Sequence, residues 1–350
     1  IYYLIFDRYA STQALKDYYG YDNSDFIDFL TQKGFYVAQE SFANYPFTNL
    51  SLSSSLNMKY LEWLTPILGE DSTDYRPFNG LLNHHNVWEF LRKRGYFYYH
   101  FGSEWSYTAW NPVADVNYAF VQTISLPAFS MKLLETTMLY PVFSHSIWLG
   151  GQPVIKAYNL ETIHQDVALD QLDKLVNIPQ TNQPKFIFAH ILLPHEVYVF
   201  ERDGTFIPAK VAASRDRRVN YLNQLVYTTK LIENLVEKLL AKTKGQAVII
   251  IQADEGPFPV RYKNNEYSFK WRYATTAEIK EKFGILNAQF WPGVDTKVFY
   301  PSMTPVNTFR LLFNQYFEAN LPLLPDRIIG VEDRLHPYHF VELTDRVRGN

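Results

Sequence analysis

The chain has 350 residues, of which 47% are hydrophobic and 20% are charged, so it can bury a large core and is not intrinsically disordered. Its formal net charge of -3 supplies no overall basic field, which argues against a nucleic-acid partner. Because it contains no cysteine, disulfides, thiolate metal sites and a cysteine nucleophile are excluded.

Strands and helices alternate over the first hundred residues. The pattern predicts strands over 1–6, 35–38 and 96–99, and helices over 23–33, 50–60 and 86–94. Asn23 or Ser24 is a suitable N-cap for the first helix, and Gly34 and Gly95 end two of the helices. The first strand ends directly at Asp7.

The middle of the chain, 103–180, is less regular, with helical pieces over 127–138 and 160–175. We expect this region to cover the mouth of a site or one side of a sheet. No repeat or low-complexity segment interrupts it.

The second half repeats the alternation with longer elements. A buried strand is predicted over 185–193, a long amphipathic helix over 216–244 and a β-branched strand over 247–251 that leads to Asp254. Alternating strands and helices predict an α/β fold with a doubly wound, mostly parallel central sheet and helices on both faces. In such sheets ligands bind beyond the carboxyl ends of the strands, where Asp7, segment 190–195 and Asp254 are expected.

Two carboxylates and one hydroxyl are candidates for chemistry. Asp7 and Asp254 each follow an apolar strand, and converging carboxylates repel each other unless a cation lies between them. Oxygen ligands suit Mg, Mn or Ca, and Zn also accepts carboxylates. Taken singly, either aspartate also fits a helix cap or a turn. Thr48 precedes a Ser- and Leu-rich helical segment, where it fits an N-cap or a nucleophile aided by the helix dipole.

Four blocks in order carry a resemblance to a known family. They are Phe6-Asp7, segment 34–54 with Asn44-Tyr45-Pro46-Phe47-Thr48, Pro194-His195-Glu196-Val197-Tyr198, and Ile249-Ile250-Ile251-Gln252-Ala253-Asp254-Glu255-Gly256. This ordered set resembles the alkaline phosphatase/sulfatase superfamily, in the sulfatase-like branch with lipoteichoic acid synthases and phosphoethanolamine transferases. The third block is similar to the family's Pro-His-x-Pro-Tyr segment, and the fourth to its strand that ends in Asp-His-Gly.

The resemblance implies roles for individual residues. Asp7 and Asp254 match metal ligands, and Thr48 matches a nucleophile that also contacts the metal. His195 matches a histidine at the substrate or leaving group. His190 is expected to assist substrate binding, with a structural role as the alternative, and Trp105 to contact substrate.

Two features concern charge in the site. Glu255 stands where the family has histidine, and it is expected either to bind one divalent ion as a harder oxygen ligand or to mark a site without catalysis. Arg8 is a candidate for binding an anionic substrate. The run 215–218 offers the same chemistry but fits a solvated helix start better.

The resemblance therefore implies a metal-dependent hydrolase or transferase of phosphate or sulfate esters, with a covalent threonine intermediate. Its anionic substrate would be lipid- or glycan-linked, in modification of the bacterial cell envelope. The alternative is a catalytically silent domain with a binding or structural role. A dinucleotide-binding enzyme is excluded because segment 8–11 is not a glycine-rich turn.

The start of the chain suggests a larger protein. No apolar run reaches the ~20 residues that span a bilayer, and no signal peptide is visible. Residues 1–6 already form an apolar run, so we expect 1–350 to be one domain excised from a longer membrane protein. By analogy with the family, it would work at the extracytoplasmic face of the bacterial cytoplasmic membrane.

Overall fold

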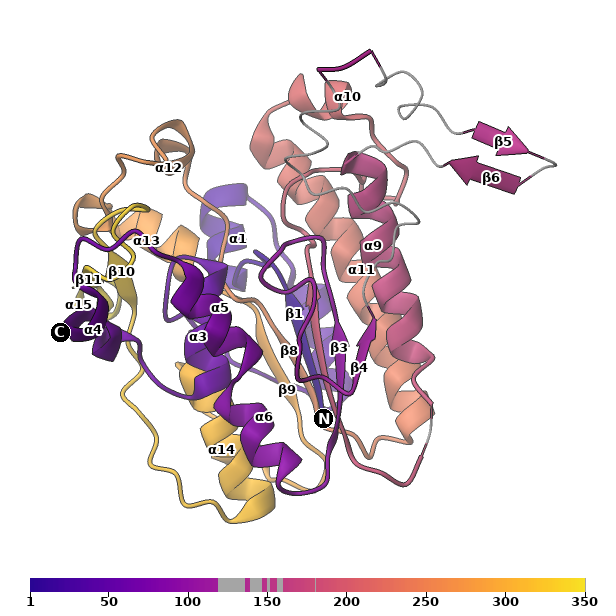
Figure 1. Ribbon diagram of the computed structural model, residues 1–350, viewed down its shortest axis with the longest axis vertical. Coiled ribbons are helices and arrows are strands. Elements are labelled where there is room, and N and C mark those ends of the chain that lie inside the picture. Colours follow the sequence, from indigo (N-terminus) through magenta and orange to yellow (C-terminus); the bar gives the residue numbers. More distant parts are fainter. Residues whose placement is uncertain (119–135, 139–146, 150–151, 156–159, 180, 350) are drawn as a thin grey trace.

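A seven-stranded sheet forms the centre of the fold, seen in a computed structural model that describes residues 1–118, 136–138, 147–149, 152–155, 160–179 and 181–349 (Figure 1). Its order is β2-β9-β8-β1-β7-β3-β4. The bounds are β1 Tyr2–Phe6, β2 Tyr36–Val37, β3 Phe97–Phe101, β4 Val116–Tyr118, β7 Lys185–Ile191, β8 Ile249–Gln252 and β9 Asn287–Phe290. Strands β8, β1, β7, β3 and β4 are parallel neighbours, and β9 runs antiparallel to β8. The predicted α/β fold with a mostly parallel sheet is confirmed.

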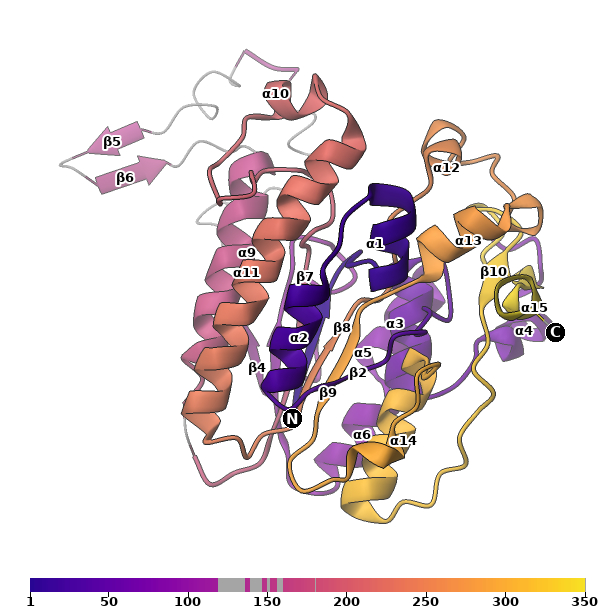
Figure 2. The same cartoon turned by 180° about the vertical axis from the view of Figure 1, so that it is seen from behind.

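Helices cover both faces of this sheet (Figures 1 and 2). One layer holds α3 Thr48–Asn57, α5 Arg76–Asn83, α6 Asn86–Arg92 and α14 Pro305–Phe317. The opposite layer holds α2 Ser24–Gln32, α9 Leu160–Val176 and α11 Arg217–Thr243. No helix among the described residues is both long enough and apolar enough to cross a membrane.

The two helix layers explain why the central strands are mostly apolar. In β1, alternate side chains pack into different cores: Leu4 and Phe6 lie in one buried cluster and Tyr3 and Ile5 in the other. Side chains of a strand alternate between faces, so a strand covered on both faces is hydrophobic at most positions, with exceptions such as His190 in β7 and Gln252 in β8. This is why the apolar runs predicted the central strands correctly.

The long predicted helix over 216–244 is α11, and its ends follow from local chemistry. The side chain of Asp216 caps the helix by accepting hydrogen bonds from the main-chain N–H groups of Arg218 and Val219. Lys244 ends it in the left-handed conformation. The predicted helix over 160–175 is α9, whereas most of the one over 127–138 lies outside the described residues.

Several elements were not predicted from the sequence. Helix α13, Thr276–Phe283, begins with a capping box between Thr275 and Glu278, a signal present in the sequence but overlooked. Strand β9 buries Asn287 and Gln289, so it lacks the expected apolar pattern. The remaining elements are α1 Thr12–Tyr19, α4 Thr65–Leu68, α10 Ala209–Ala213, α12 Val260–Asn264, α15 Thr344–Arg348, β5 Ile147–Leu149, β6 Gln152–Ile155, β10 Ile329–Val331 and β11 Phe340–Glu342, with short 3-10 turns at Glu62–Leu64, Trp271–Tyr273 and Thr296–Val298.

Candidate active site

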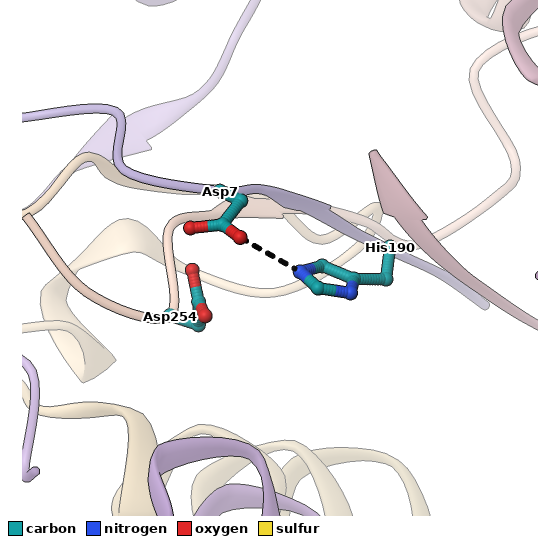
Figure 3. A group of neighbouring side chains, drawn as sticks. All are labelled: Asp7, His190 and Asp254. Carbon is teal, nitrogen blue, oxygen red and sulfur yellow. Dashed lines mark ion pairs between the residues drawn. The ribbon is translucent and has the colours of Figure 1, made fainter. Parts of the chain in front are cut away.

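Three buried side chains meet at the carboxyl ends of the central strands (Figure 3). Asp7 follows β1, His190 lies near the end of β7, and Asp254 lies two residues beyond β8. Strand β1 pairs in parallel with both β7 and β8, which brings the three ends together. One ligand atom from each residue lies within 4.8 Å of the others. The predicted convergence of the two aspartates therefore includes a histidine that the sequence analysis assigned to the substrate.

The ring of His190 is held by a hydrogen bond behind it. Its Nδ1 lies 2.8 Å from Oγ1 of Thr108, which in turn lies 2.8 Å from Oγ of Ser103. Its Nε2 lies 3.4 Å from Oδ2 of Asp7 and faces the carboxylates. A hydrogen bond at one ring nitrogen commonly orients the other toward a metal ion.

The carboxylate oxygens of Asp7 and Asp254 have few hydrogen-bond partners. Among the described residues, Oδ1 of Asp7 and both side-chain oxygens of Asp254 accept no hydrogen bond of normal geometry. Buried polar atoms without partners cost free energy, and a bound cation removes that cost. Two carboxylates and one imidazole are a donor set that suits a divalent ion such as Mn or Zn, so the residues present fit a metal.

The electrostatics of the group agree with this fit. Burial raises the pKa of Asp254 well above its usual value, and repulsion from Asp7 and Glu255 adds to the rise, while the Thr48 hydroxyl opposes it. Burial also acts to raise the pKa of Asp7, but His195, His190 and Arg8 more than offset it, so that pKa is lowered. The carboxylate of Asp7 is thus stabilised as an anion, whereas that of Asp254 resists ionisation when no cation is bound.

Thr48 is the first residue of α3 and is not the helix cap. Phe47 occupies the N-cap position, with an extended backbone and no side-chain cap. A hydrogen bond of 2.6 Å from Oγ of Ser51 to the main-chain carbonyl of Asp254 ties this first turn to the end of β8. The Thr48 hydroxyl is half-buried at a helix N-terminus, where the helix dipole favours negative charge.

A cavity of about 490 Å³ opens beside the buried group. Of the eight predicted site residues, six line it: Asp7, Arg8, Thr48, Trp105, His195 and Glu255. The other two, His190 and Asp254, are the buried members of the group. Trp105 stacks on Tyr107 with ring centres 4.7 Å apart and presents an edge contact to His190 at 5.9 Å.

His195 lines the cavity as a neutral imidazole. Burial, followed by repulsion from Arg8, lowers its pKa to about 3. Its Nδ1 contacts the main-chain carbonyl of Glu196, which places the ring proton on Nδ1 and leaves Nε2 as a proton acceptor. Nε2 of Gln224 donates a 2.6 Å hydrogen bond to the carbonyl of His195 and fixes the loop.

Glu255 is buried next to Asp254, but its carboxylate contacts cations of the protein. Its Oε1 lies 2.7 Å from Nζ of Lys282 and 3.2 Å from Nε of Arg8. Lys282 is fully buried, and burial lowers its pKa to about 7 although Glu255 acts to raise it. The sequence analysis did not find Lys282, because it did not predict α13 and a lysine ordinarily faces solvent.

The basic run at the start of α11 also contributes an ion pair beside the site. A terminal nitrogen of Arg217 lies 2.8 Å from Glu196, which lines the cavity, whereas Arg215 pairs with Glu201 away from it. Asp216 serves as the helix cap. Within the run 215–218, Arg217 is therefore the residue that forms an ion pair with a cavity-lining side chain, that of Glu196.

Comparison with known proteins agrees with this fold. A sequence model of the Sulfatase family matches residues 14–279, and the chain belongs to that family. The resemblance to the alkaline phosphatase/sulfatase superfamily inferred from the ordered motifs is confirmed. A search of curated proteins found no match.

Solved structures share the fold at low sequence identity. The C-terminal periplasmic domain of EcEptC from Escherichia coli, in a complex with Zn, is 11% identical and has a TM-score of 0.57; the match covers 99% of this chain and 93% of that one. The soluble domain of lipooligosaccharide phosphoethanolamine transferase A from Neisseria meningitidis is 11% identical, with a TM-score of 0.52 and coverage of 89% and 86%. The lipoteichoic acid synthase LtaP from Listeria monocytogenes is 12% identical, with a TM-score of 0.52 and coverage of 98% and 80%.

Proposed function

We propose that the chain is a metal-dependent hydrolase or transferase of phosphate or sulfate esters that forms a covalent ester on Thr48. The observation that carries this proposal is the position of Thr48, which is the first residue of α3 and not its cap, and which lines the cavity together with Asp7. Membership of the Sulfatase family supports ester chemistry of this kind.

The proposed metal ligands are Asp7, Asp254 and Thr48, as predicted from the sequence, and the geometry adds His190. A bound divalent cation would lower the pKa of the Thr48 hydroxyl and offset charge on the ester oxygens. A neighbour whose structure holds Zn supports a divalent ion. The assignment of Glu255 as a further ligand stays a prediction.

The chain's own residues would then carry out two displacements. Oγ1 of Thr48 gives its proton to Nε2 of the neutral His195 and attacks phosphorus or sulfur. The bond to the leaving oxygen breaks, that oxygen takes the proton from His195, and Thr48 carries the group as an ester. Water or an acceptor alcohol next gives up a proton, takes the group and frees Oγ1 of Thr48, which takes a proton back through His195. His195 was predicted to protonate the leaving oxygen; in the neutral state its Nε2 takes the proton of the water or alcohol in the second step. Trp105 would contact the organic part of the substrate.

The test is replacement of Thr48 by Ala and by Ser. Thr48→Ala should lose turnover of an aryl phosphate or sulfate while it unfolds at the wild-type temperature, and Thr48→Ser should keep part of the turnover. In acid-quenched wild type, mass spectrometry should find the transferred group on the peptide that contains residue 48. Full turnover by Thr48→Ala would disprove the proposal.

The alternative of a catalytically silent domain has one observation in its favour, namely that the carboxylate of Glu255 is engaged by Lys282 and Arg8. Metal analysis of the purified protein separates the two functions. A silent domain would contain no metal, and Mn or Mg would not stimulate it.

We also propose that this single domain acts outside the bacterial cytoplasmic membrane on a lipid- or glycan-linked anionic ester. Two neighbours support this, since one is a periplasmic domain and the other is the soluble domain of a lipooligosaccharide phosphoethanolamine transferase. Protease accessibility in spheroplasts of cells that express the complete gene product tests the location. Protection of the domain in intact spheroplasts would contradict it.

A further inference from the structure

Arg8 has an unusual backbone that delivers its side chain to the cavity. It follows Asp7 at the end of β1 and has a φ of 63°, in the left-handed region that favours glycine. This conformation is unfavourable for a residue with a Cβ, so neighbouring groups must stabilise it. The hydroxyl of Tyr221 does so by donating a 2.7 Å hydrogen bond to the carbonyl of Arg8. The side chain is only 8% exposed and lines the cavity.

The guanidinium of Arg8 contacts Glu255 and Phe258 on one side. Its Nε lies 3.2 Å from Oε1 of Glu255, and its central carbon lies 4.6 Å from the ring centre of Phe258. Its terminal nitrogen NH1 lies 3.3 Å from Oε1 of Glu196 but makes no hydrogen bond among the described residues. A buried guanidinium donor without a hydrogen bond, on the wall of a cavity, is suited to an incoming acceptor.

Glu255 is committed to two buried cations. The same oxygen that contacts Arg8 lies 2.7 Å from Nζ of Lys282. Lys282 has no exposed surface, donates a 2.8 Å hydrogen bond to the carbonyl of Gly256, and lies 3.3 Å above the ring centre of Phe258. If Glu255 turned to a metal, two buried cations would lose their shared counter-charge, at a cost of several kcal/mol.

From these contacts we propose that Glu255 is a positioning residue and not a metal ligand. It holds Arg8 so that the terminal nitrogens of the guanidinium bind two oxygens of the anionic ester. This rests on the proposed function, because it assigns roles within the same cavity. The planar guanidinium can donate two parallel hydrogen bonds to a phosphate or sulfate, and the contact at Nε fixes the plane in which it does so.

The balance of charges around the guanidinium of Arg8 favours the binding of an anion. Four basic side chains gather here, those of Arg8, Lys282, Lys263 and Arg217. They stand against three carboxylates, those of Glu255, Glu196 and Asp7, whose Oδ1 lies 4.0 Å from Nε of Arg8. Glu196 also contacts Lys263 and Arg217, so it stays paired when an ester oxygen replaces it at Arg8. The anion therefore meets a net positive charge without leaving a carboxylate unpaired.

The test measures anion and metal binding separately, by calorimetry on metal-free protein titrated with inorganic phosphate and, in a second series, with Mn²⁺. The double variant Glu255→Met/Lys282→Met removes one acidic and one basic side chain and takes away the oxygen that accepts from Nε of Arg8; it also removes the hydrogen bond from Lys282 to the carbonyl of Gly256. Arg8→Lys keeps the positive charge but removes the planar guanidinium that can donate two parallel hydrogen bonds. Both should weaken phosphate binding about tenfold, equivalent to about 1.4 kcal/mol, and leave the Kd for Mn²⁺ within about threefold of wild type.

A matched control is Glu342→Gln, which removes a similar contact to Nε of Arg327 on the surface and should change neither Kd. The proposal is overturned if the double variant weakens Mn²⁺ binding and leaves phosphate binding as in wild type, or if wild type binds no phosphate. Thermal unfolding of each variant verifies folding, and Arg8→Lys decides the question if the double variant does not fold. Failure of the proposed function looks different: wild type would bind no Mn²⁺ and show no turnover, while the phosphate series would still test the role of Glu255.

Discussion

The hydroxyl of Ser51 donates a 2.6 Å hydrogen bond to the main-chain carbonyl of Asp254, and both residues are buried. Ser51 lies one turn after Thr48 in α3, and Asp254 lies just beyond β8. The bond therefore joins the helix that carries the proposed nucleophile to the strand end that carries the proposed metal ligand. A displacement of either element would change the distance between their reactive groups.

Ser51→Ala should lower both stability and turnover. The variant leaves a buried carbonyl without its donor, at a cost of about 1–3 kcal/mol, and lets the first turn of α3 shift from Asp254. Urea unfolding and kcat measure the two effects. Ser53→Ala is the control, because Ser53 also donates from α3 to a buried carbonyl, that of Phe78, but away from the site. Equal losses of kcat in both variants would contradict a specific role of the Ser51 bond.

Asp254→Asn should stabilise the metal-free protein and abolish its response to metal. The raised pKa of Asp254 means that its contribution to stability is complete below the unfolded value of 3.8 and is lost as the pH rises through the folded pKa. Asparagine removes this loss. At ~pH 8 without metal the variant should therefore unfold at a higher temperature than wild type.

Bound metal should reverse this order, so that wild type unfolds at a higher temperature than Asp254→Asn. At 100 times its Kd, Mn²⁺ should stabilise wild type by about 2.7 kcal/mol and the variant far less. Thermal unfolding with EDTA and with Mn²⁺ measures both effects, with the surface variant Asp295→Asn as the control. A variant that gains as much stability from Mn²⁺ as wild type does would exclude Asp254 as a ligand.

His85 should make the protein sensitive to acid. It is fully buried, and its Nδ1 accepts a 3.0 Å hydrogen bond from the main-chain N–H of Trp88 at the start of α6. Burial lowers its pKa to about 3, so the stability it contributes is present above 6.5 and is lost as the pH falls toward the folded value. Between ~pH 8 and ~pH 5 the loss is about 2 kcal/mol.

Replacing His85 by Asn keeps a capping side chain but removes the titration. Urea unfolding at the two pH values should show a smaller drop in stability for His85→Asn than for wild type. The exposed neighbour His84 supplies the control variant His84→Asn, which should behave as wild type does. An unchanged drop in His85→Asn would show that other groups cause the acid sensitivity.

Much of the fold was predictable because buried strands need continuous apolar sequence and long helices need caps. The runs that became β1, β7 and β8, and the capped helix α11, were recognised for these reasons. Strand β9 was missed because its buried polar side chains bond to one another and to their surroundings: Asn287 donates to Ser41, and Gln289 donates to Asn287. No pattern along the chain indicates such pairing.

The sequence by itself determined where the candidate site lies, because polar residues that directly follow apolar parallel strands emerge at the same edge of the sheet. This put Asp7 and Asp254 together, and the ordered motifs added Thr48. Only the tertiary structure decided which groups these residues meet. His190 joins the two aspartates, and Glu255 contacts Lys282 and Arg8, although residues 8 and 282 lie far apart in the sequence. The direction of a buried side chain depends on charges brought in by distant segments, and those charges exist as neighbours only after the chain has folded.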